Sequence, residues 1–343
     1  MTHGVIHLEN DYSEGAHPAI LARLADENLR ARSGYGADDA CESAAARIRG
    51  AIGRDDADVH FLIGGTSANL IALAAFLRPH EAIVCTEQAH INVHETGAIE
   101  ASGHKSLPFP TTDGKLTPSM IEQLYAKHVD EHMVKPRVAY ISNATELGTV
   151  YTRGELYALK DCCAKLNLLL YMDGARLGAA LAASDVDWSD LPRCLDAFYI
   201  GGTKNGALFG EAMVILNESL KPDFRYLIKQ RGGMLAKGFL LGYQFDVLFE
   251  GGLYLDIARR ANGIADGLRG VLAAKGARFL ADTRTNMLFP ILPDAWIAKL
   301  RERFAFHDAE RVSSTESAVR LVTSWATPES VVTEFERCVN QLR

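Results

Sequence analysis

The chain has 343 residues, of which 48% are hydrophobic, 23% charged and 8% aromatic, a balance that is typical of folded globular proteins. This composition excludes a disordered or low-complexity protein. The 36 Lys and Arg residues and 43 Asp and Glu residues give a formal net charge of −7, which disfavours binding to nucleic acid or to an anionic membrane.

The cysteines and the N-terminal segment indicate where the protein works. The first residues carry neither a basic segment nor an apolar run of the secretory kind, and the longest apolar run, 70–77, is too short to span a membrane. We therefore expect a reduced, cytoplasmic protein with free thiols, and we assign no metal site. The six cysteines are scattered without a CxxC pair: Cys41, Cys85, Cys162, Cys163, Cys194 and Cys338.

Short apolar runs alternate with segments of helical period through the first 250 residues. Such alternation predicts an α/β domain with a mostly parallel sheet that is buried on both faces. Strands are predicted over 59–63, 82–85, 137–142, 168–172, 197–200 and 212–216, and helices over 17–32, 39–52, 66–77, 90–100 and 153–166.

The pattern changes after Gly251 and Gly252. A long amphipathic segment over 254–272 is followed by predicted strands over 287–292 and 318–323. Thr327 and Pro328 suit the N-cap and first turn of a final helix. We therefore expect a large α/β domain over 1–250 and a smaller C-terminal α+β domain over 251–343.

Small residues over 64–69 separate a predicted strand from a predicted helix. Glycines at this place let a ligand approach the backbone N–H groups, and the helix dipole favours an anion there. The segment matches neither the dinucleotide nor the nucleoside-triphosphate fingerprint, so it favours a single phosphate group. The alternative is an ordinary turn with a capping threonine.

Two further strand ends carry residues that chemistry could use. Asp173 follows the strand 168–172, where a carboxylate could keep a heterocyclic ring nitrogen protonated, and Arg176 could bind a carboxylate or a phosphate. Lys204 follows the strand 197–200 among glycines, where partial burial would free its amine to form a Schiff base. Taken singly, these residues could equally be a helix cap with its surface partner and a solvated lysine. Together with the predicted phosphate-binding turn at 64–69, they match what pyridoxal phosphate requires.

Four segments resemble the low-specificity L-threonine aldolases of the threonine aldolase and β-eliminating lyase family: AHINVHETGA, ATELGTVYTRGEL, LYMDGARLGAAL and YIGGTKNGALFGEAMV. The resemblance extends from LEND at 8–11 and SGYG at 33–36 to AVRLVT at 318–323. It implies the fold of the fold-type-I pyridoxal-phosphate enzymes, with a mostly parallel seven-stranded sheet. It also implies an aldehyde-lyase that cleaves L-threonine or L-allo-threonine to glycine and acetaldehyde.

The resemblance carries roles to individual residues. Lys204 would bind the cofactor covalently, Asp173 would pair with its ring nitrogen, and His90 would stack on its ring. Arg320 would hold the substrate carboxylate, and Glu146 stands where many relatives place a histidine near the substrate hydroxyl. The cofactor-binding set is completed by Gly65, Thr66, Arg176 and Thr203, and the substrate-binding set by Asn10, Tyr35, His94 and Arg176.

The resemblance leaves several points open. Either His90 or Glu146, or a water, could be the catalytic base, and Glu146 could instead be a structural acid. A β-eliminating lyase, racemase or aminotransferase would share the cofactor and the fold, and an inactive binding protein would share the fold alone. The family's habit implies a homodimer or homotetramer with composite sites, in which Tyr35 reaches across the interface.

Overall fold

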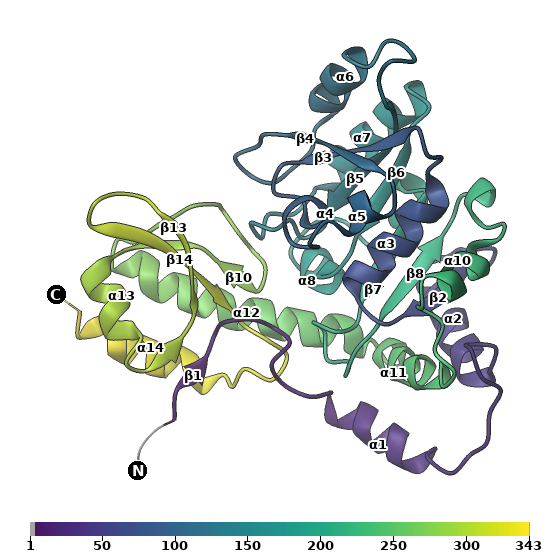
Figure 1. The fold of residues 1–343 in the computed structure, drawn as a ribbon. Coiled ribbons are helices and arrows are strands. Elements are labelled where there is room, and N and C mark those ends of the chain that lie inside the picture. The colour runs from purple at the N-terminus through teal and green to yellow at the C-terminus, as the bar shows by residue number, and fades with distance from the viewer. Residues whose placement is uncertain (1–3, 343) are drawn as a thin grey trace.

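The computed structural model describes residues 4–342, and its central feature is a seven-stranded sheet in the order β2-β8-β7-β6-β5-β3-β4 (Figure 1). Neighbouring strands are parallel except at β8, which is antiparallel to both β2 and β7. The strands of this sheet are β2 (Asp58–Leu62), β3 (Glu81–Thr86), β4 (Lys105–Phe109), β5 (Lys135–Ser142), β6 (Leu169–Asp173), β7 (Ala197–Gly201) and β8 (Glu211–Ile215).

Helices cover this sheet and the segments around it (Figure 1). They are α1 (Pro18–Asp26), α2 (Asp39–Ile52), α3 (Gly65–Phe76), α4 (His90–Val93), α5 (Ala98–Ala101), α6 (Pro118–Ala126), α7 (Arg153–Lys165), α8 (Leu177–Ala182), α9 (Leu191–Cys194), the 3-10 helix η1 (Glu218–Leu220), α10 (Phe224–Gln230) and α11 (Phe239–Phe249).

The C-terminal part is built on the long helix α12 (Leu253–Ala274), with α13 (Asp294–Leu300) and α14 (Ser330–Asn340). Its antiparallel sheet contains β9 (Arg278–Phe279), β10 (Met287–Leu288), β11 (Pro290–Pro293), β13 (His307–Arg311) and β14 (Glu316–Val322). The N-terminal β1 (Ile6–His7) pairs in parallel with β12 (Phe304–Ala305), so the start of the chain is tied to this part.

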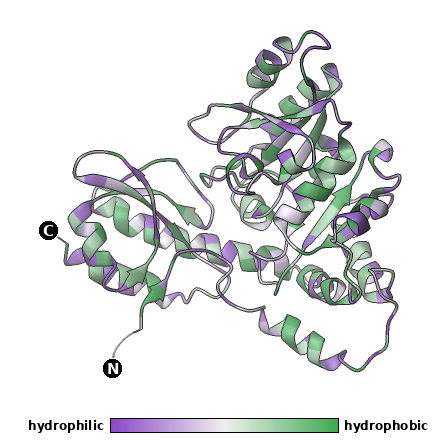
Figure 2. Ribbon diagram, in the orientation of Figure 1, coloured by the Kyte–Doolittle hydropathy of each residue, from purple (hydrophilic) through white to green (hydrophobic). Residues whose placement is uncertain are grey.

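The large sheet is buried on both faces because its central strands are apolar at successive positions. Leu170 and Met172 of β6 pack in the hydrophobic cluster on one face, whereas Leu169 and Tyr171 pack in the cluster on the other. The strands at the centre are correspondingly hydrophobic in Figure 2. A parallel sheet covered in this way places its polar strand ends along one edge, where ligands bind in open α/β sheets.

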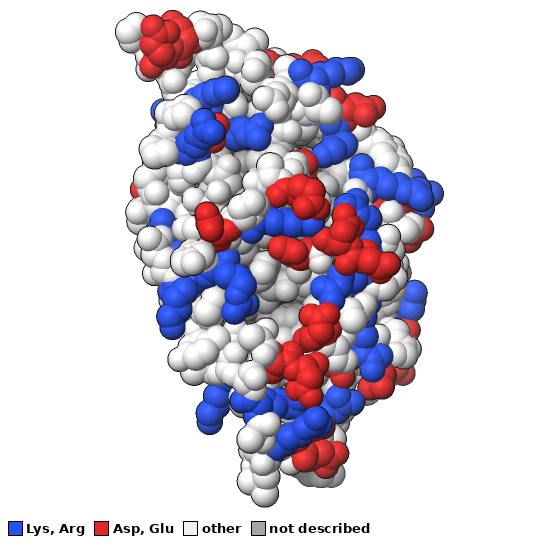
Figure 3. All heavy atoms as spheres, turned by 90° about the vertical axis from the view of Figure 1, so that its right-hand side faces the viewer, with Lys and Arg blue, Asp and Glu red and all other residues white. Residues whose placement is uncertain are grey.

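Acidic and basic side chains share the outer surface. They are interspersed over the face seen in Figure 3. Within residues 4–342, no helix has both the length and the hydropathy that a membrane span needs.

Two predicted helices are shorter or broken in the structure. The helix predicted over 17–32 ends at Asp26. Leu29, beyond this end, is 95% exposed, so the apolar face of the helix does not continue to residue 32. The helix predicted over 90–100 is interrupted between α4 and α5, where Thr96 and Gly97 adopt φ angles of 52° and 73°. A left-handed pair of residues cannot continue a right-handed helix.

The predicted cap of the last helix is wrong, and one strand of the large sheet was not predicted. The cap residue of α14 is Glu329, while the Thr327 hydroxyl oxygen accepts a hydrogen bond from the Ser324 N–H at 2.8 Å. The unpredicted strand is β4, which lies at the edge of the sheet. Its Pro108 disfavours a strand in the sequence, but an edge position tolerates the missing N–H.

Candidate active site

A cavity of about 520 Å³ lies at the carboxyl ends of β5 and β6, between the sheet and the C-terminal part. Its size is ordinary for a cofactor or small-molecule site. It brings together side chains and backbone from residues that are far apart in the sequence. The predicted site residues that line it are Gly65, Thr66, His90, His94, Glu146, Asp173, Arg176, Lys204 and Arg320.

Asp173 ends β6 and is buried with 3% of its surface exposed. Its Oδ2 accepts hydrogen bonds from Asn69 Nδ2 at 2.9 Å and from the Tyr140 hydroxyl at 2.7 Å. The Tyr199 hydroxyl and the Ala175 N–H donate to Oδ1. Burial by itself would raise the pKa of Asp173, but these donors outweigh it and lower the pKa below its usual value. The structure therefore holds a buried negative charge at the floor of the cavity.

Lys204 lies in the turn after β7, facing the same cavity. Burial, followed by the charge of Arg176, lowers the pKa of its amine. A lowered pKa increases the fraction of neutral amine, the form that attacks a carbonyl carbon. The nearby Glu211 carboxylate accepts hydrogen bonds from the Gly202 N–H and the Thr203 hydroxyl, both at 2.9 Å, and so fixes the turn.

The first turn of α3 presents free backbone donors to the cavity. Gly64 occupies the cap position, and none of the described side chains caps the helix. A Cβ at Gly65 would lie 3.0 Å from the Tyr199 hydroxyl, which itself bonds to Asp173. Glycine at 65 thus keeps this wall open, and the helix N-terminus favours an anion beside Thr66.

His90 and Glu146 lie side by side at one wall. The backbone N–H of His90 donates to Glu146 Oε1 at 2.9 Å, and the Ser142 hydroxyl donates to the same oxygen at 2.7 Å. Burial raises the pKa of Glu146 despite these donors. Burial would lower the pKa of His90, but a hydrogen bond to Glu95 at 2.8 Å and the charge of Asp173 raise it overall.

The two predicted arginines have different surroundings. Arg176 Nε and Nη2 pair with the two carboxylate oxygens of Asp11, at 2.7 and 3.0 Å. Among residues 4–342, Arg320 makes only a 3.3 Å bond from Nη2 to the carbonyl oxygen of Glu9, and its buried Nε has no hydrogen-bond partner there. Arg320 is therefore the cation with free donors for an incoming carboxylate.

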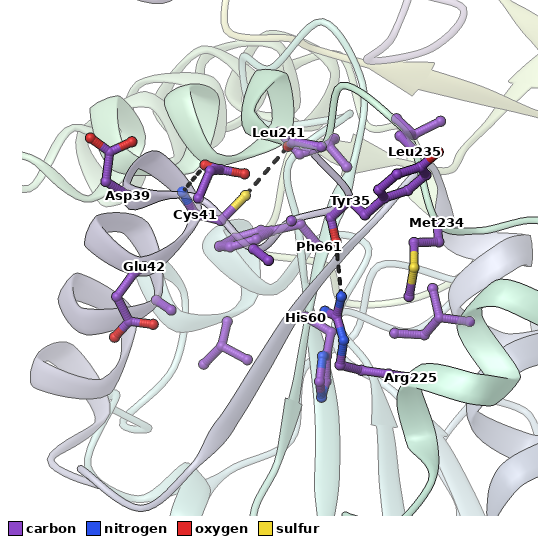
Figure 4. Close-up of a pocket in the computed structure, with 17 residues that line it drawn as sticks. Tyr35, Asp39, Cys41, Glu42, His60, Phe61, Arg225, Met234, Leu235 and Leu241 are labelled. Atoms are coloured by element: carbon purple, nitrogen blue, oxygen red, sulfur yellow. Dashed lines mark hydrogen bonds between the residues drawn. The ribbon is translucent and has the colours of Figure 1, made fainter. Parts of the chain in front are cut away.

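Three predicted site residues lie outside this cavity. Asn10 Oδ1 accepts hydrogen bonds from the Tyr12 N–H and the Ser13 hydroxyl, both at 2.9 Å, within its own turn. Thr203 bonds to Glu211, so it supports the lysine turn instead of lining the cavity. Tyr35 lines a second pocket of about 310 Å³ together with His60 and Cys41 (Figure 4).

The prediction missed residues that support the site from behind. Asp11 adjoins the predicted Asn10, and Asn69, Glu95 and Glu211 lie within or next to segments already singled out. Tyr140 lies within an apolar strand, and nothing in the sequence indicates that its hydroxyl contacts the site. Asp11, Asn69 and Tyr140 contact the site across long sequence separations, so spacing alone could not reveal them. Glu95 and Glu211 lie 5 and 9 residues from their partners His90 and Gly202.

The cavity fits pyridoxal phosphate. A cofactor with an anionic phosphate, a basic ring nitrogen and an aldehyde needs, in turn, an anion seat, a buried carboxylate and a neutral amine. The uncapped start of α3, Asp173 and Lys204 provide these groups in one cavity. The free Nε of Arg320 adds a seat for a substrate carboxylate.

Comparison with known proteins agrees with this geometry. The profile of a family described as beta-eliminating lyase matches residues 15–326. The low-specificity L-threonine aldolase of Pseudomonas aeruginosa is 33% identical to this chain, over 98% of each sequence. The structure of a Leishmania major threonine aldolase is 45% identical, with a TM-score of 0.97 over 98% of this chain and 99% of that one.

A more distant structure shows the fold alone. A mutant aspartate aminotransferase of Thermus thermophilus superposes with a TM-score of 0.73 at 14% identity, over 98% of this chain and 91% of that one. The predicted family and the predicted fold-type-I architecture are thereby confirmed.

Proposed function

Because the chain belongs to the beta-eliminating lyase family, we propose that it is a pyridoxal-phosphate-dependent threonine aldolase. It cleaves L-threonine, L-allo-threonine or a related β-hydroxy-α-amino acid to glycine and an aldehyde such as acetaldehyde. The observation that carries the proposal is the meeting of Lys204, Asp173 and the uncapped start of α3 in one cavity, opposite Arg320. The names of the relatives in Pseudomonas aeruginosa and Leishmania major support the same substrate class.

The bound cofactor supplies a conjugated ring that accepts the electron pair released when a bond at the substrate Cα breaks. Lys204 would hold the cofactor through its amine, whose pKa burial lowers toward the neutral form. Asp173 remains ionised because its hydrogen bonds lower its pKa. The negative charge of Asp173 would hold a proton on the ring nitrogen of the cofactor.

Arg320 binds the substrate carboxylate and sets which bond at Cα breaks. Its free donors fix the carboxylate at the wall formed by the C-terminal part. His90 and Glu146 lie at another wall, where one of them removes the proton of the β-hydroxyl and so releases the aldehyde. The proton is returned at Cα to yield glycine.

The test uses the full chain reconstituted with pyridoxal phosphate. We expect an absorbance band of the bound cofactor that glycine and L-threonine perturb, together with acetaldehyde release from L-threonine and L-allo-threonine. Borohydride reduction followed by peptide mass spectrometry should place the pyridoxyl group on Lys204. The variant K204A should lose both the label and activity, while K105A, at an exposed lysine of β4, should keep both.

Other products would contradict the proposal. Pyruvate from serine, racemised alanine, or amino transfer, without acetaldehyde from threonine, would move the chain to another reaction of the same cofactor. A chain that binds no cofactor would be a binding protein of this fold.

We also propose the features of the assembly that the resemblance implies. The chain forms a homodimer or homotetramer with composite sites, and Tyr35 reaches the neighbouring subunit from its half-exposed position. The chain divides into domains at residue 250, next to the paired glycines before α12. Free cysteines suit a cytoplasmic location. Sedimentation analysis and mixed dimers of K204A with a Tyr35 variant test the assembly.

A further inference from the structure

A chain of hydrogen bonds runs behind the cavity and joins two of its walls. Asn69 Nδ2 lies 2.9 Å from Asp173 Oδ2 and 2.8 Å from Glu95 Oε1. The same oxygen of Glu95 lies 2.8 Å from His90 Nδ1. The four residues come from β6, α3, the bend after α4 and the start of α4, so the network connects separate elements.

The orientation of Asn69 is fixed by a further bond. Its Oδ1 accepts a hydrogen bond from the Tyr171 hydroxyl at 3.0 Å, which leaves its amino group facing both carboxylates. Asn69 is fully buried and the Glu95 side chain has no exposed surface. Glu95 Oε1 thus accepts one hydrogen bond from the Asn69 amide. For the same oxygen to accept a second hydrogen bond from the neutral His90 ring, the ring proton must lie on Nδ1.

The backbone is shaped to bring Glu95 to this place. α4 ends at Val93, and the left-handed φ angles of Thr96 and Gly97 then turn the chain back before α5. A continuous helix over 90–100 would place residue 95 more than one turn beyond His90, on a different face. The break in the helix thus lets Glu95 approach the ring of His90.

We propose that Glu95 is a positioning residue that makes Nε2 of His90 the proton acceptor in catalysis. This inference rests on the proposed function and deepens it, since it selects the base for the β-hydroxyl proton. The Nδ1 edge of the ring is held against the fully buried Glu95, whereas the ring as a whole lines the cavity and is 34% exposed. Nε2, on the opposite edge, carries a free lone pair toward the substrate.

The charges around His90 support the same role. Burial lowers the pKa of His90, while the hydrogen bond to Glu95 and the charge of Asp173 raise it; Lys204 opposes them weakly, and the net pKa is raised. His94 packs with its ring centroid 5.6 Å from that of His90. An imidazole with a raised pKa binds the transferred proton more firmly.

Glu146 has a different set of contacts. Its Oε1 accepts hydrogen bonds from the backbone N–H of His90 and from the Ser142 hydroxyl, so this carboxyl group holds the start of α4 in place. Its substitution should therefore lower the rate through the position of His90, without removing the titration of the base.

The experiment combines nitrogen NMR of the holoenzyme, labelled with ¹⁵N at histidine, with pH profiles of kcat/KM for L-threonine. The resonances of His90 are assigned from their loss in H90N. In the wild type, the neutral ring should be protonated at Nδ1. In E95Q, which keeps the shape of the side chain, the pKa of His90 should fall by about one unit.

The kinetic expectation follows from the same change. The acidic limb of the E95Q profile should move to lower pH together with the NMR titration, and kcat should fall about 10- to 100-fold with little change in KM. H90N should lose the limb and E146Q should retain it. E100Q, at an exposed glutamate of α5, should leave both measurements unchanged.

Two results would overturn the inference. One is a neutral His90 that carries its proton on Nε2, and the other is an E95Q variant whose His90 pKa and acidic limb do not move. The NMR measurement needs no turnover, so it tests Glu95 even if the chain cleaves no threonine. Failure of the proposed function would appear separately, as absence of acetaldehyde from the wild type.

Discussion

Asp11 and Arg176 form a bidentate ion pair although they lie 165 residues apart in the sequence. Arg176 Nε lies 2.7 Å from Asp11 Oδ2, and Nη2 lies 3.0 Å from Oδ1. Asn286 Nδ2 donates to the same carboxylate at 2.9 Å. One buried carboxylate thus joins the N-terminal arm to the large sheet and to the C-terminal part. Because Arg176 is paired with Asp11, we expect Arg320 to be the cation that binds the substrate.

Removing Asp11 should destabilise the fold. The carboxylate is 1% exposed, so D11A would leave Arg176 charged and unpaired in a buried place. Breaking a buried pair by loss of one partner costs about 3–5 kcal/mol of unfolding free energy. Urea denaturation followed by circular dichroism measures the change.

The control for D11A is D256A, which removes an exposed carboxylate that pairs with Arg259 on α12. Exposed pairs contribute about 1 kcal/mol or less. A loss in D11A no larger than that in D256A would contradict the importance of the Asp11 pair.

Removing Arg320 should weaken substrate binding. Its guanidinium lines the cavity with a free Nε, so R320A would lose charged hydrogen bonds to the substrate carboxylate. We expect KM for L-threonine to rise about 10- to 100-fold. Steady-state kinetics at saturating cofactor measure this change.

Two further variants sharpen this test. R320K keeps the charge but not the planar fork, so it should recover only part of the affinity. R278A removes an arginine of β9 that pairs with Glu316 at the surface, and it should leave KM unchanged. An R320A enzyme with normal KM would assign the carboxylate to another residue.

How far the sequence predicted the fold depended on the kind of signal each element carries. The strands β3, β5, β6, β7 and β8 were predicted because they are continuous apolar runs. β4 was missed because Pro108 interrupts a short, alternating segment. The two-residue strands β1, β9 and β12 are too short to show a period, and pairing with distant partners defines them.

The candidate site was predicted where residues stand at strand ends. Asp173 and Lys204 follow apolar strands, and parallel strands place such residues at one edge. Asn69 was not recognised because its role depends on a contact with Asp173, 104 positions away. The turn that directs Glu95 inward depends on the left-handed Thr96, a conformation that threonine rarely adopts and that its sequence does not signal.

The stability of the fold should depend on pH through His60, in the pocket of Figure 4. Burial, followed by the charge of Arg225, lowers the pKa of His60 to about 4 from its usual 6.5. The folded state therefore keeps the ring neutral down to about pH 4, while the unfolded chain binds a proton below about pH 6.5. The contribution is fully present above pH 6.5 and is lost as the pH falls toward 4, by about 3 kcal/mol in total.

The variant H60F tests this dependence. It keeps a ring against Phe224, whose centroid lies 5.1 Å from that of His60, and removes the titration. The unfolding free energy of H60F relative to the wild type should rise as the pH is lowered from 7 to about 4. H132Q, at an exposed histidine, controls for loss of a histidine elsewhere. Parallel curves for H60F and the wild type would contradict the assignment.

A Cβ at Gly174 should not be tolerated. Gly174 follows Asp173, and a Cβ built there lies 1.9 Å from the carbonyl oxygen of Tyr199 on β7. The obstacle is backbone, so G174A must push β6 and β7 apart at the point where Asp173 and Lys204 face the cavity. We expect a loss of about 3 kcal/mol in unfolding free energy and weaker retention of pyridoxal phosphate.

The matched control is G154A in the first turn of α7, where no described atom lies within 4 Å of the added carbon. G154A should leave cofactor binding unchanged and stabilise the chain by up to about 1 kcal/mol, because alanine loses less backbone freedom in a helix. Equal stability and cofactor retention in the two variants would show that the β6 and β7 ends can separate without cost.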